Sequence, residues 1–276
     1  MLNLDNARRL SGGASRETWE GERDGRTLIL RKGPGMKTEA ALIAAAAEAG
    51  VPVPQVVEAG DDYLLMERIE GETIPRKILR DPPPGLARQC GEILARLHTI
   101  DPPEGLDHTD QLKQFRTLLD TLGQPHPAFE IAFRWLDANR PPPPPAPKLV
   151  HGDFRNGNLV VGPDGIRAVL DWELAHAGDP IEDLGWLCVK SWRFGVDQPV
   201  GGFGTYDELL DGYGRPDLDR DHLRWWEVMG TLKWGIMCIL QATAHTSGAH
   251  RSVELAAIGR RVCEVEWDLL QVLPRA

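Results

Sequence analysis

Three side chains that carry oxygen ligands lie close together in the sequence: Asp153, Asn158 and Asp171. A carboxylate and an amide oxygen side by side suit a hard cation such as Mg²⁺, which keeps coordination positions open for phosphate. A further carboxylate could accept a proton from a substrate hydroxyl while the cation neutralises a phosphoryl group. The alternative is that each residue merely forms a turn, because Asp and Asn are common in turns. The combination of all three favours phosphoryl transfer.

A β-hairpin is expected to bring Asn158 and Asp171 together. Residues 159–161 and 166–170 read as strands, and Asp-Gly between apolar runs is a strong hairpin signal. If Asp164 and Gly165 are the two turn residues, Asn158 lies directly opposite Asp171. Their Cβ atoms would then be about 4.5–5.5 Å apart on one face of the hairpin.

The elements around this stretch divide into a β-rich part and a helical part. Residues 16–22, 27–32 and 63–69 are strand-like, and turn residues separate them. Residues 38–49 are rich in alanine and predict one helix, with Thr38 as its N-cap. Further helical patterns cover residues 86–99, 111–122, 127–139, 206–213, 219–246 and 252–273. We therefore predict an α+β fold of two lobes with a ligand cleft between them.

Composition narrows the classes of partner. The chain has 276 residues, with 31 Lys plus Arg against 41 Asp plus Glu, which gives a formal net charge of −10. Phosphate-rich partners need a basic footprint, so nucleic acid and anionic membranes are not expected. The longest uncharged apolar run, residues 40–47, is too short to cross a bilayer. The opening residues lack an apolar signal core and the four cysteines are widely spaced, so we expect a reducing cytoplasm.

Two motifs point to a known superfamily. His151-Gly-Asp-Phe-Arg-Asn-Gly-Asn158 together with Leu170-Asp-Trp-Glu173 resembles the aminoglycoside phosphotransferase and choline kinase superfamily, which is related to protein kinases. Gly178-Asp179-Pro180 with Asp183 matches the segment that follows in these proteins. The resemblance covers nearly the whole chain and implies a protein-kinase-like fold, with an amino-terminal lobe over residues 1–69 and a helical lobe over residues 70–276.

The resemblance also implies a role for each motif residue. Asp153 would be the catalytic base, and Asn158 and Asp171 would hold Mg²⁺. His151 would be a structural residue of the loop, neither a metal ligand nor a nucleophile's partner. Asp183 would brace the catalytic loop without reacting.

A glycine-containing segment near the amino terminus could contact phosphates. Ser11, Gly12, Gly13 and Ser15 precede a strand, so backbone N–H groups and serine hydroxyls could act as donors there. An ordinary turn would use the same residues.

One position departs from the pattern of the related kinases. Those enzymes use a lysine on the third strand to hold the nucleotide phosphates and pair it with a glutamate on the next helix. Here Arg31 occupies that position, with Glu39 as its expected partner and Lys32 facing the other side of the strand. Arginine binds phosphate with a planar fork, although it does not substitute freely for lysine. The alternative for Glu39 is a first-turn acid favoured by the helix dipole.

Residues 64–71 resemble the hinge between the lobes of this superfamily. By that resemblance the carbonyl of Glu67 and the N–H of Ile69 would contact the adenine edge. A plain edge strand is the alternative.

These observations favour an ATP- or GTP- and Mg²⁺-dependent kinase that phosphorylates a small-molecule hydroxyl. The 170–173 motif and residues 259–270 resemble the branch of kinase domains attached to acyl-CoA dehydrogenases, so a hydroxy-acyl compound is an alternative acceptor to an aminoglycoside. Two other functions stay open. Arg31 in place of lysine would suit a catalytically weak, nucleotide-binding scaffold. A metal-dependent phosphohydrolase shares the acidic loop but would need a second metal cluster or a nucleophile.

Overall fold

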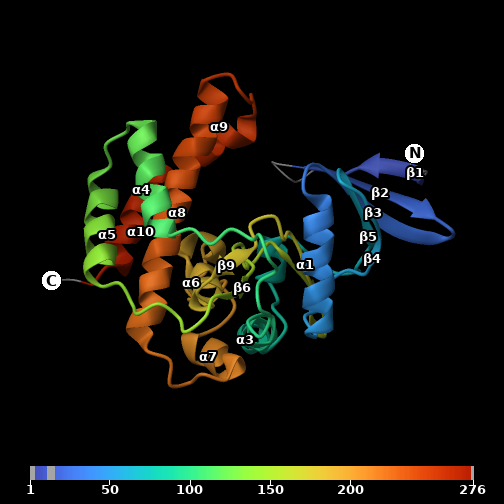
Figure 1. Ribbon diagram of the computed structural model, residues 1–276, viewed down its shortest axis with the longest axis horizontal. Coiled ribbons are helices and arrows are strands. Elements are labelled where there is room, and N and C mark those ends of the chain that lie inside the picture. Colours follow the sequence, from blue (N-terminus) through green and yellow to red (C-terminus); the bar gives the residue numbers. More distant parts are fainter. Residues whose placement is uncertain (1–3, 11–15, 275–276) are drawn as a thin grey trace.

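The computed structural model describes residues 4–10 and 16–274 and has the predicted α+β, two-lobed architecture (Figure 1). The amino-terminal lobe is a five-stranded antiparallel sheet in the order β1-β2-β3-β5-β4. In chain order, three of its strands precede a single helix and two strands follow it. The strands are β1 (Asp5–Arg9), β2 (Glu17–Arg23), β3 (Arg26–Lys32), β4 (Val56–Ala59) and β5 (Tyr63–Glu67).

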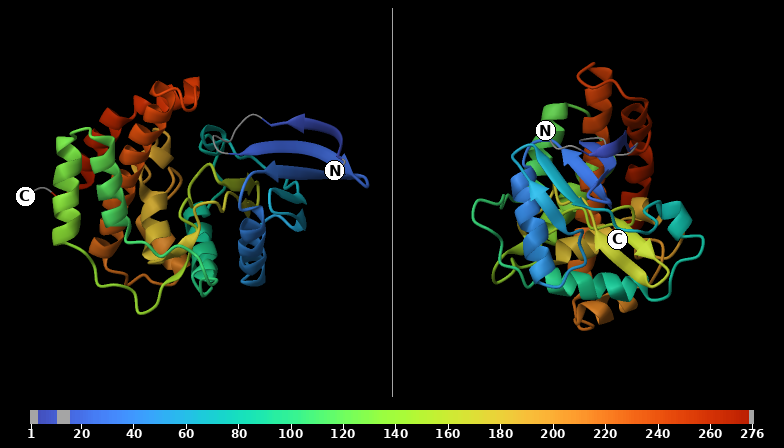
Figure 2. Two further views of the ribbon diagram at one scale, coloured as in Figure 1. Left: turned by 45° about the horizontal axis from the view of Figure 1, so that its top comes forward. Right: turned by 90° about the vertical axis from the view of Figure 1, so that its right-hand side faces the viewer.

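The helix of this lobe, α1 (Met36–Glu48), lies against the sheet (Figure 2). Its large apolar residues Met36, Leu42 and Ile43 are buried, and Glu39 is buried with them. The N-cap is Gly35 in a left-handed conformation, so the prediction of Thr38 as the cap was wrong by three positions. An alanine-rich helix depends little on a side-chain cap, which is why the sequence marks its start weakly.

The remainder of the chain is mainly helical. The long helix α8 runs through the middle of this part, with α4, α5 and α10 on one side of it (Figure 1). The helices are α2 (Pro75–Ile78), α3 (Leu86–Leu97), α4 (Gln111–Leu122), α5 (Pro127–Ala138), α6 (Ile181–Cys188), α7 (Tyr206–Tyr213), α8 (Arg220–Thr246), α9 (Val253–Gly259) and α10 (Val262–Val272).

Two differences from the predicted helices have physical reasons. Helix α6 was missed because all its residues are buried, so it lacks the one-sided apolar pattern of a surface helix. The single helix predicted over 252–273 is two helices, α9 and α10. Gly259 ends α9 against α8, where an added Cβ would lie 2.6 Å from the Cβ of Ala242.

Two short pairs of antiparallel strands flank the loop of residues 151–158 in the helical lobe. Strand β6 (Lys148–Val150) pairs with β9 (His176–Gly178), and β7 (Leu159–Gly162) pairs with β8 (Gly165–Val169). Backbone hydrogen bonds join Glu72, just after the amino-terminal lobe, to Val161 in both directions at 2.8 and 2.9 Å. This contact fixes the β7–β8 hairpin beside the connection between the lobes.

The hairpin forms where predicted, but its register differs. Gly162 pairs with Gly165, so Pro163 and Asp164 form the turn, and an irregularity after Val160 shifts the pairing again. The carbonyl of Asn158 consequently accepts a hydrogen bond from the N–H of Leu170 at 2.8 Å. The predicted pairing of Asn158 directly opposite Asp171 is therefore wrong.

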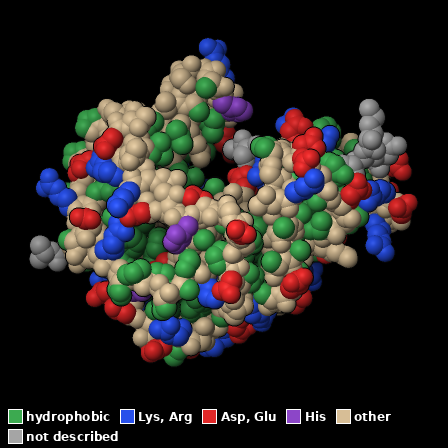
Figure 3. Space-filling model, in the orientation of Figure 1, with side chains coloured by type: hydrophobic (Ala, Val, Ile, Leu, Met, Phe, Trp, Pro, Cys, Tyr) green, Lys and Arg blue, Asp and Glu red, His purple; other side chains and the backbone are tan. Residues whose placement is uncertain are grey.

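Charge on the surface agrees with the composition. Acidic and basic side chains are interspersed on the face that Figure 3 shows, as expected for a chain whose acids outnumber its bases. Within the described residues, no helix combines the length and the apolar character that a bilayer span requires.

Candidate active site

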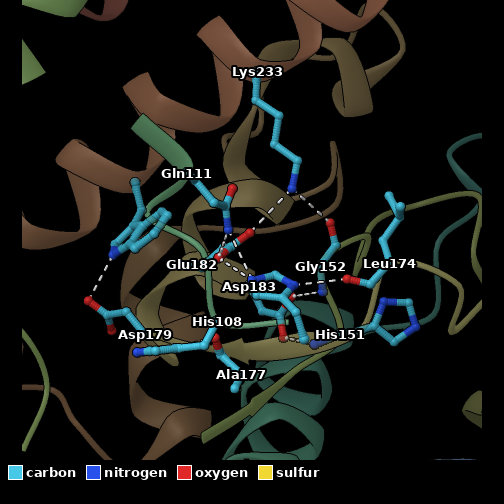
Figure 4. Close-up of polar contacts among 12 residues, drawn as sticks. His108, Gln111, His151, Gly152, Leu174, Ala177, Asp179, Glu182, Asp183 and Lys233 are labelled. Carbon is cyan, nitrogen blue, oxygen red and sulfur yellow. Dashed lines mark hydrogen bonds and ion pairs between the residues drawn. The ribbon is translucent and has the colours of Figure 1, made fainter. Parts of the chain in front are cut away.

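One buried carboxylate, that of Asp183, binds the backbone of the loop that carries Asp153. Asp183, on the first turn of α6, accepts hydrogen bonds from the backbone N–H of His151 at 2.8 Å and of Gly152 at 2.9 Å (Figure 4). Its side chain has no exposed surface, and His98 lies 3.2 Å from it. Asp183 thus contacts the loop as a brace, as its place in the motif suggested.

Gly152 is required at its position by two constraints. Its φ of 77° lies in the left-handed region, which side chains rarely adopt. An added Cβ would also lie 2.4 Å from the carbonyl oxygen of Leu174. The backbone therefore turns sharply immediately before Asp153.

The carboxylate of Asp153 is held in one orientation by three donors. Asn158 donates its amide hydrogen to Oδ2 at 2.6 Å, and the indole N–H of Trp186 donates to Oδ1 at 2.8 Å. The guanidinium of Arg155 also donates to Oδ1 at 2.9 Å. With 13% of its side chain exposed, Asp153 remains open to a small substrate group. A carboxylate so placed can accept a proton from a hydroxyl that approaches it.

His151 supports the same loop as a neutral ring. Its Nδ1 accepts the backbone N–H of Asp153 at 3.2 Å, so Nε2 carries the hydrogen and donates to the carbonyl of Leu170 at 3.1 Å. Burial lowers the pKa of His151, while nearby carboxylates oppose that shift only in part. Both nitrogens are used within the fold, which leaves His151 without a free atom for a substrate.

Asn158 and Asp171 lie on either side of the hairpin base and have different partners. The amide nitrogen of Asn158 is used by Asp153, which leaves its amide oxygen for a cation. Asp171 has a φ of 69° and accepts a hydrogen bond from Arg31 at 2.8 Å. Among the described residues, no cluster of three or more His, Cys, Asp or Glu could hold a metal. A site for Mg²⁺ here would need phosphate oxygens as further ligands.

Arg31 and Glu39 are in contact, as the sequence predicted. The guanidinium of Arg31 donates to Glu39 and to Asp171, so it links the helix of the amino-terminal lobe to the β8 end of the other lobe. Arg16 also donates to Glu39 and lies 3.2 Å from Glu173. Glu39, only 2% exposed, is thus shared by two arginines.

The sequence reasoning missed Arg16, which contacts Glu39, and Trp186, which contacts Asp153. It also missed Lys233, whose Nζ lies 3.4 Å from the carbonyl oxygen of Gly152. A lone arginine after a glycine segment has no recognisable signal, and Trp186 lies in a helix that was not predicted. Of the expected phosphate loop, Ser11, Gly12, Gly13 and Ser15 lie outside the described residues.

The expected hinge is the end of β5 and the chain after it. Glu67 ends the strand, and its side chain accepts the backbone N–H of Gln55 at 2.8 Å. Ile69 follows two residues later and is partly buried. Gly71 then approaches the hairpin so closely that an added Cβ would lie 2.6 Å from a side-chain carbon of Val160.

Comparison with known proteins agrees with this arrangement. Residues 6–226 match the phosphotransferase enzyme family. The chain belongs to that family. Its candidate catalytic loop, with Asp153, Asn158 and Asp171, lies within the matched region.

Curated relatives of this phosphotransferase are much longer proteins. Mouse acyl-CoA dehydrogenase family member 10 is 31% identical over 302 aligned residues, which cover 88% of the chain and 27% of the relative. Chicken acyl-CoA dehydrogenase family member 11 is 30% identical, over 65% of the chain and 27% of the relative. The chain therefore spans about a quarter of the length of these relatives.

Solved structures share the fold at lower identity. Spectinomycin phosphotransferase in complex with ADP and spectinomycin has a TM-score of 0.71 at 13% identity, over 98% of this chain and 94% of that one. A choline/ethanolamine kinase family protein from Mesorhizobium loti has a TM-score of 0.71 at 20% identity, over 96% and 92% of the two chains. Both comparisons confirm the protein-kinase-like fold.

Proposed function

We propose that this phosphotransferase transfers the γ-phosphoryl group of ATP or GTP to a small-molecule hydroxyl, with Asp153 as the general base. The observation that carries the proposal is the orientation of Asp153. Three donors on Asn158, Trp186 and Arg155 fix its carboxylate while leaving it partly exposed. A general base at this point accepts the hydroxyl proton as the oxygen attacks the phosphoryl group.

Mg²⁺ fits the residues next to the base. The amide oxygen of Asn158 and the carboxylate of Asp171 are hard oxygen ligands, and Asp171 already has a cationic partner in the guanidinium of Arg31. We assign Asn158 and Asp171 to the metal, which would neutralise charge on the transferred group. Because Mg²⁺ commonly binds one or two protein carboxylates and phosphate oxygens, the lack of a larger acidic cluster is no obstacle.

We assign the nucleotide to the amino-terminal lobe. Arg31 would hold phosphate oxygens, and Glu39 would orient it, as the lysine and glutamate of related kinases do. The carbonyl of Glu67 and the N–H of Ile69 would contact the base, and the segment with Ser11, Gly12, Gly13 and Ser15 would cover the phosphates. Solved neighbours in complex with ADP or AMP-PNP support nucleotide binding by this fold.

The surroundings of Asp153 favour a hydroxy-acyl acceptor over an aminoglycoside. Arg155 stacks on the ring of Trp192 at 4.5 Å, and the rings of Trp186, Trp192 and Trp234 follow one another at 5.2 and 4.9 Å. The guanidinium of Arg155, which is 24% exposed, suits a carboxylate on the acceptor and repels a polycation. An aminoglycoside would instead need acidic walls.

The test is acceptor-dependent phosphoryl transfer with a matched variant. Asp153→Asn keeps the shape of the side chain but removes the proton acceptor, so we expect turnover to fall by about 10²–10⁴-fold. Hydroxy acids, their thioesters and aminoglycosides are supplied in turn with Mg²⁺ and ATP or GTP, and the phosphorylated product is identified by mass. An Asp153→Asn variant as active as the wild type would exclude the base. Nucleotide binding without any transfer would favour the scaffold, and free phosphate alone would favour a hydrolase.

A further inference from the structure

A buried lysine lies behind the catalytic loop. Lys233, in the middle of α8, has 9% of its side chain exposed, and its Nζ is 3.3 Å from Glu182 and 3.4 Å from the carbonyl oxygen of Gly152 (Figure 4). The same ammonium group lies 4.9 Å from the centre of the Trp186 ring. Besides Glu182, Lys233 therefore contacts Gly152, which precedes Asp153 in the chain, and Trp186, which lies beside Asp153 in space.

Both contacts lead directly to the base. Gly152 precedes Asp153 in the chain, and its carbonyl orientation sets the direction of the following peptide. Trp186 donates its indole N–H to Oδ1 of Asp153 at 2.8 Å. A change at Lys233 would thus act on the backbone and on a hydrogen-bond donor of the same carboxylate.

The partner of Lys233 is itself fixed. Glu182 accepts hydrogen bonds from His176 at 3.0 Å and from Gln111. Burial would raise the pKa of Glu182, but Lys233 and His176 more than reverse this and lower it to about 2. The other ring nitrogen of His176 lies 2.9 Å from the carbonyl of Leu174, the group that Gly152 packs against. These contacts therefore connect Glu182 to the catalytic loop twice, through Lys233 and through His176.

Stability alone does not explain this arrangement. A buried ion pair often contributes no more to stability than apolar side chains of the same volume would. A pair that serves only stability would also have no need of contacts to the loop. The geometry points to Lys233 as a positioning residue for Asp153: through Gly152 and Trp186 it holds the carboxylate in the orientation that accepts the proton. This inference rests on the proposed role of Asp153.

The kinetic test compares Lys233→Met with Glu227→Gln. Glu227 is also buried on α8 and also forms an ion pair, with Arg193 at 2.7 Å, so it controls for loss of a buried charge pair in the same helix. A displacement of the base by about 1 Å can cost about 10²-fold in rate. We expect kcat to fall by that factor in Lys233→Met, with the KM for ATP within about twofold, whereas Glu227→Gln keeps its kcat. Lys233→Arg should recover part of the loss.

A second readout does not require activity. The indole N–H signal of Trp186, identified in ¹H–¹⁵N spectra by its loss in Trp186→Phe, reports the hydrogen bond to Asp153. It should shift in Lys233→Met and stay in place in Glu227→Gln. If Lys233→Met does not fold, Lys233→Met combined with Glu182→Gln removes both charges and is measured in the same two ways.

The outcomes separate this inference from the proposed function. Wild-type protein without Asp153-dependent transfer would overturn the function, and the indole signal would still decide whether Lys233 orients the carboxylate. An active wild type with an unchanged kcat and an unmoved indole signal in Lys233→Met would overturn the positioning role alone. Equal losses in Lys233→Met and Glu227→Gln would do the same, because they would mean general destabilisation.

Discussion

The two halves of the candidate site are held in different ways. The loop around Asp153 is fixed from within one lobe, by buried groups that bind its backbone: Asp183 accepts two of its N–H groups, and Lys233 contacts the carbonyl of Gly152. On the proposed nucleotide side, Arg31 joins Glu39 of one lobe to Asp171 of the other through side chains alone. The side chain of Asp171 is 33% exposed, whereas that of Asp183 is fully buried.

This difference separates what is preformed from what a ligand rearranges. Backbone groups bonded to a buried carboxylate cannot move without leaving polar atoms unpaired, so Asp153, the proposed base, is oriented before any substrate binds. The carboxylate of Asp171 is 33% exposed, and water weakens an ion pair at such a position, so the guanidinium of Arg31 can leave Asp171 for phosphate. The structure therefore separates a rigidly held Asp153, the proposed proton acceptor, from a more adaptable Arg31, the proposed phosphate ligand.

Removing the carboxylate of Asp183, which holds the loop around Asp153, should cause the largest loss of stability. Asp183→Ala leaves two buried N–H groups without an acceptor, and each such group costs about 1–3 kcal/mol, so we expect a loss of about 4 kcal/mol in the free energy of unfolding. Asp183→Asn keeps one acceptor oxygen and should lose about half as much. Urea denaturation measures both. A loss in Asp183→Ala no greater than that of a surface control such as Asp217→Ala would contradict the rigid-loop interpretation.

Acid should weaken the same half through Glu182. Its pKa in the folded protein is about 2, below the usual value of 4.5, so its ionised form stabilises the fold at pH values above about 4.5. This contribution is lost as the pH falls from about 4.5 to about 2, and a difference of that size corresponds to about 3 kcal/mol. Glu182→Gln lacks the titration, so its unfolding free energy should approach that of the wild type on acidification. A gap that stays constant between pH 7 and pH 3 would contradict this.

The rigid half was also the half that the sequence described best. The motif around Asp153 and the later Asp183 are close enough in sequence to be recognised together, and the structure shows the contacts between Asp183 and the loop. The hairpin was predicted but its register was not, because an irregularity after Val160 depends on packing and leaves no mark in the turn residues. The alternation of buried and exposed residues specifies register, and β7, which is buried throughout, has no such alternation.

Contacts between residues far apart in the sequence could not be predicted from the sequence alone. Arg31 and Glu39 are close in the chain and were paired correctly, whereas Lys233 lies far from Gly152 in the sequence, in a helix that reads as core. Its role depends on how α8 crosses α6, which periodicity alone does not give. Trp186 was missed for a related reason, since a helix buried on all sides shows no one-sided pattern.

A substitution at Arg31 should lower the affinity for Mg²⁺-ATP and hardly change the free energy of unfolding. Arg31→Met removes one guanidinium from Glu39, but Arg16 still pairs with that buried carboxylate, so the unfolding free energy should change by less than about 1 kcal/mol. The Kd for Mg²⁺-ATP should rise about 10- to 100-fold, because a charged hydrogen bond to phosphate is worth about 1.5–3 kcal/mol. Calorimetric titration and urea denaturation measure the two effects on the same samples.

Arg16→Met is the matched control for stability. The double variant should lose more unfolding free energy than the sum of the two single variants, since it leaves Glu39 buried without a partner. A stability loss in Arg31→Met as large as that in Asp183→Ala would show that the nucleotide side is as rigid as the catalytic loop, and the contrast between the two halves would be lost.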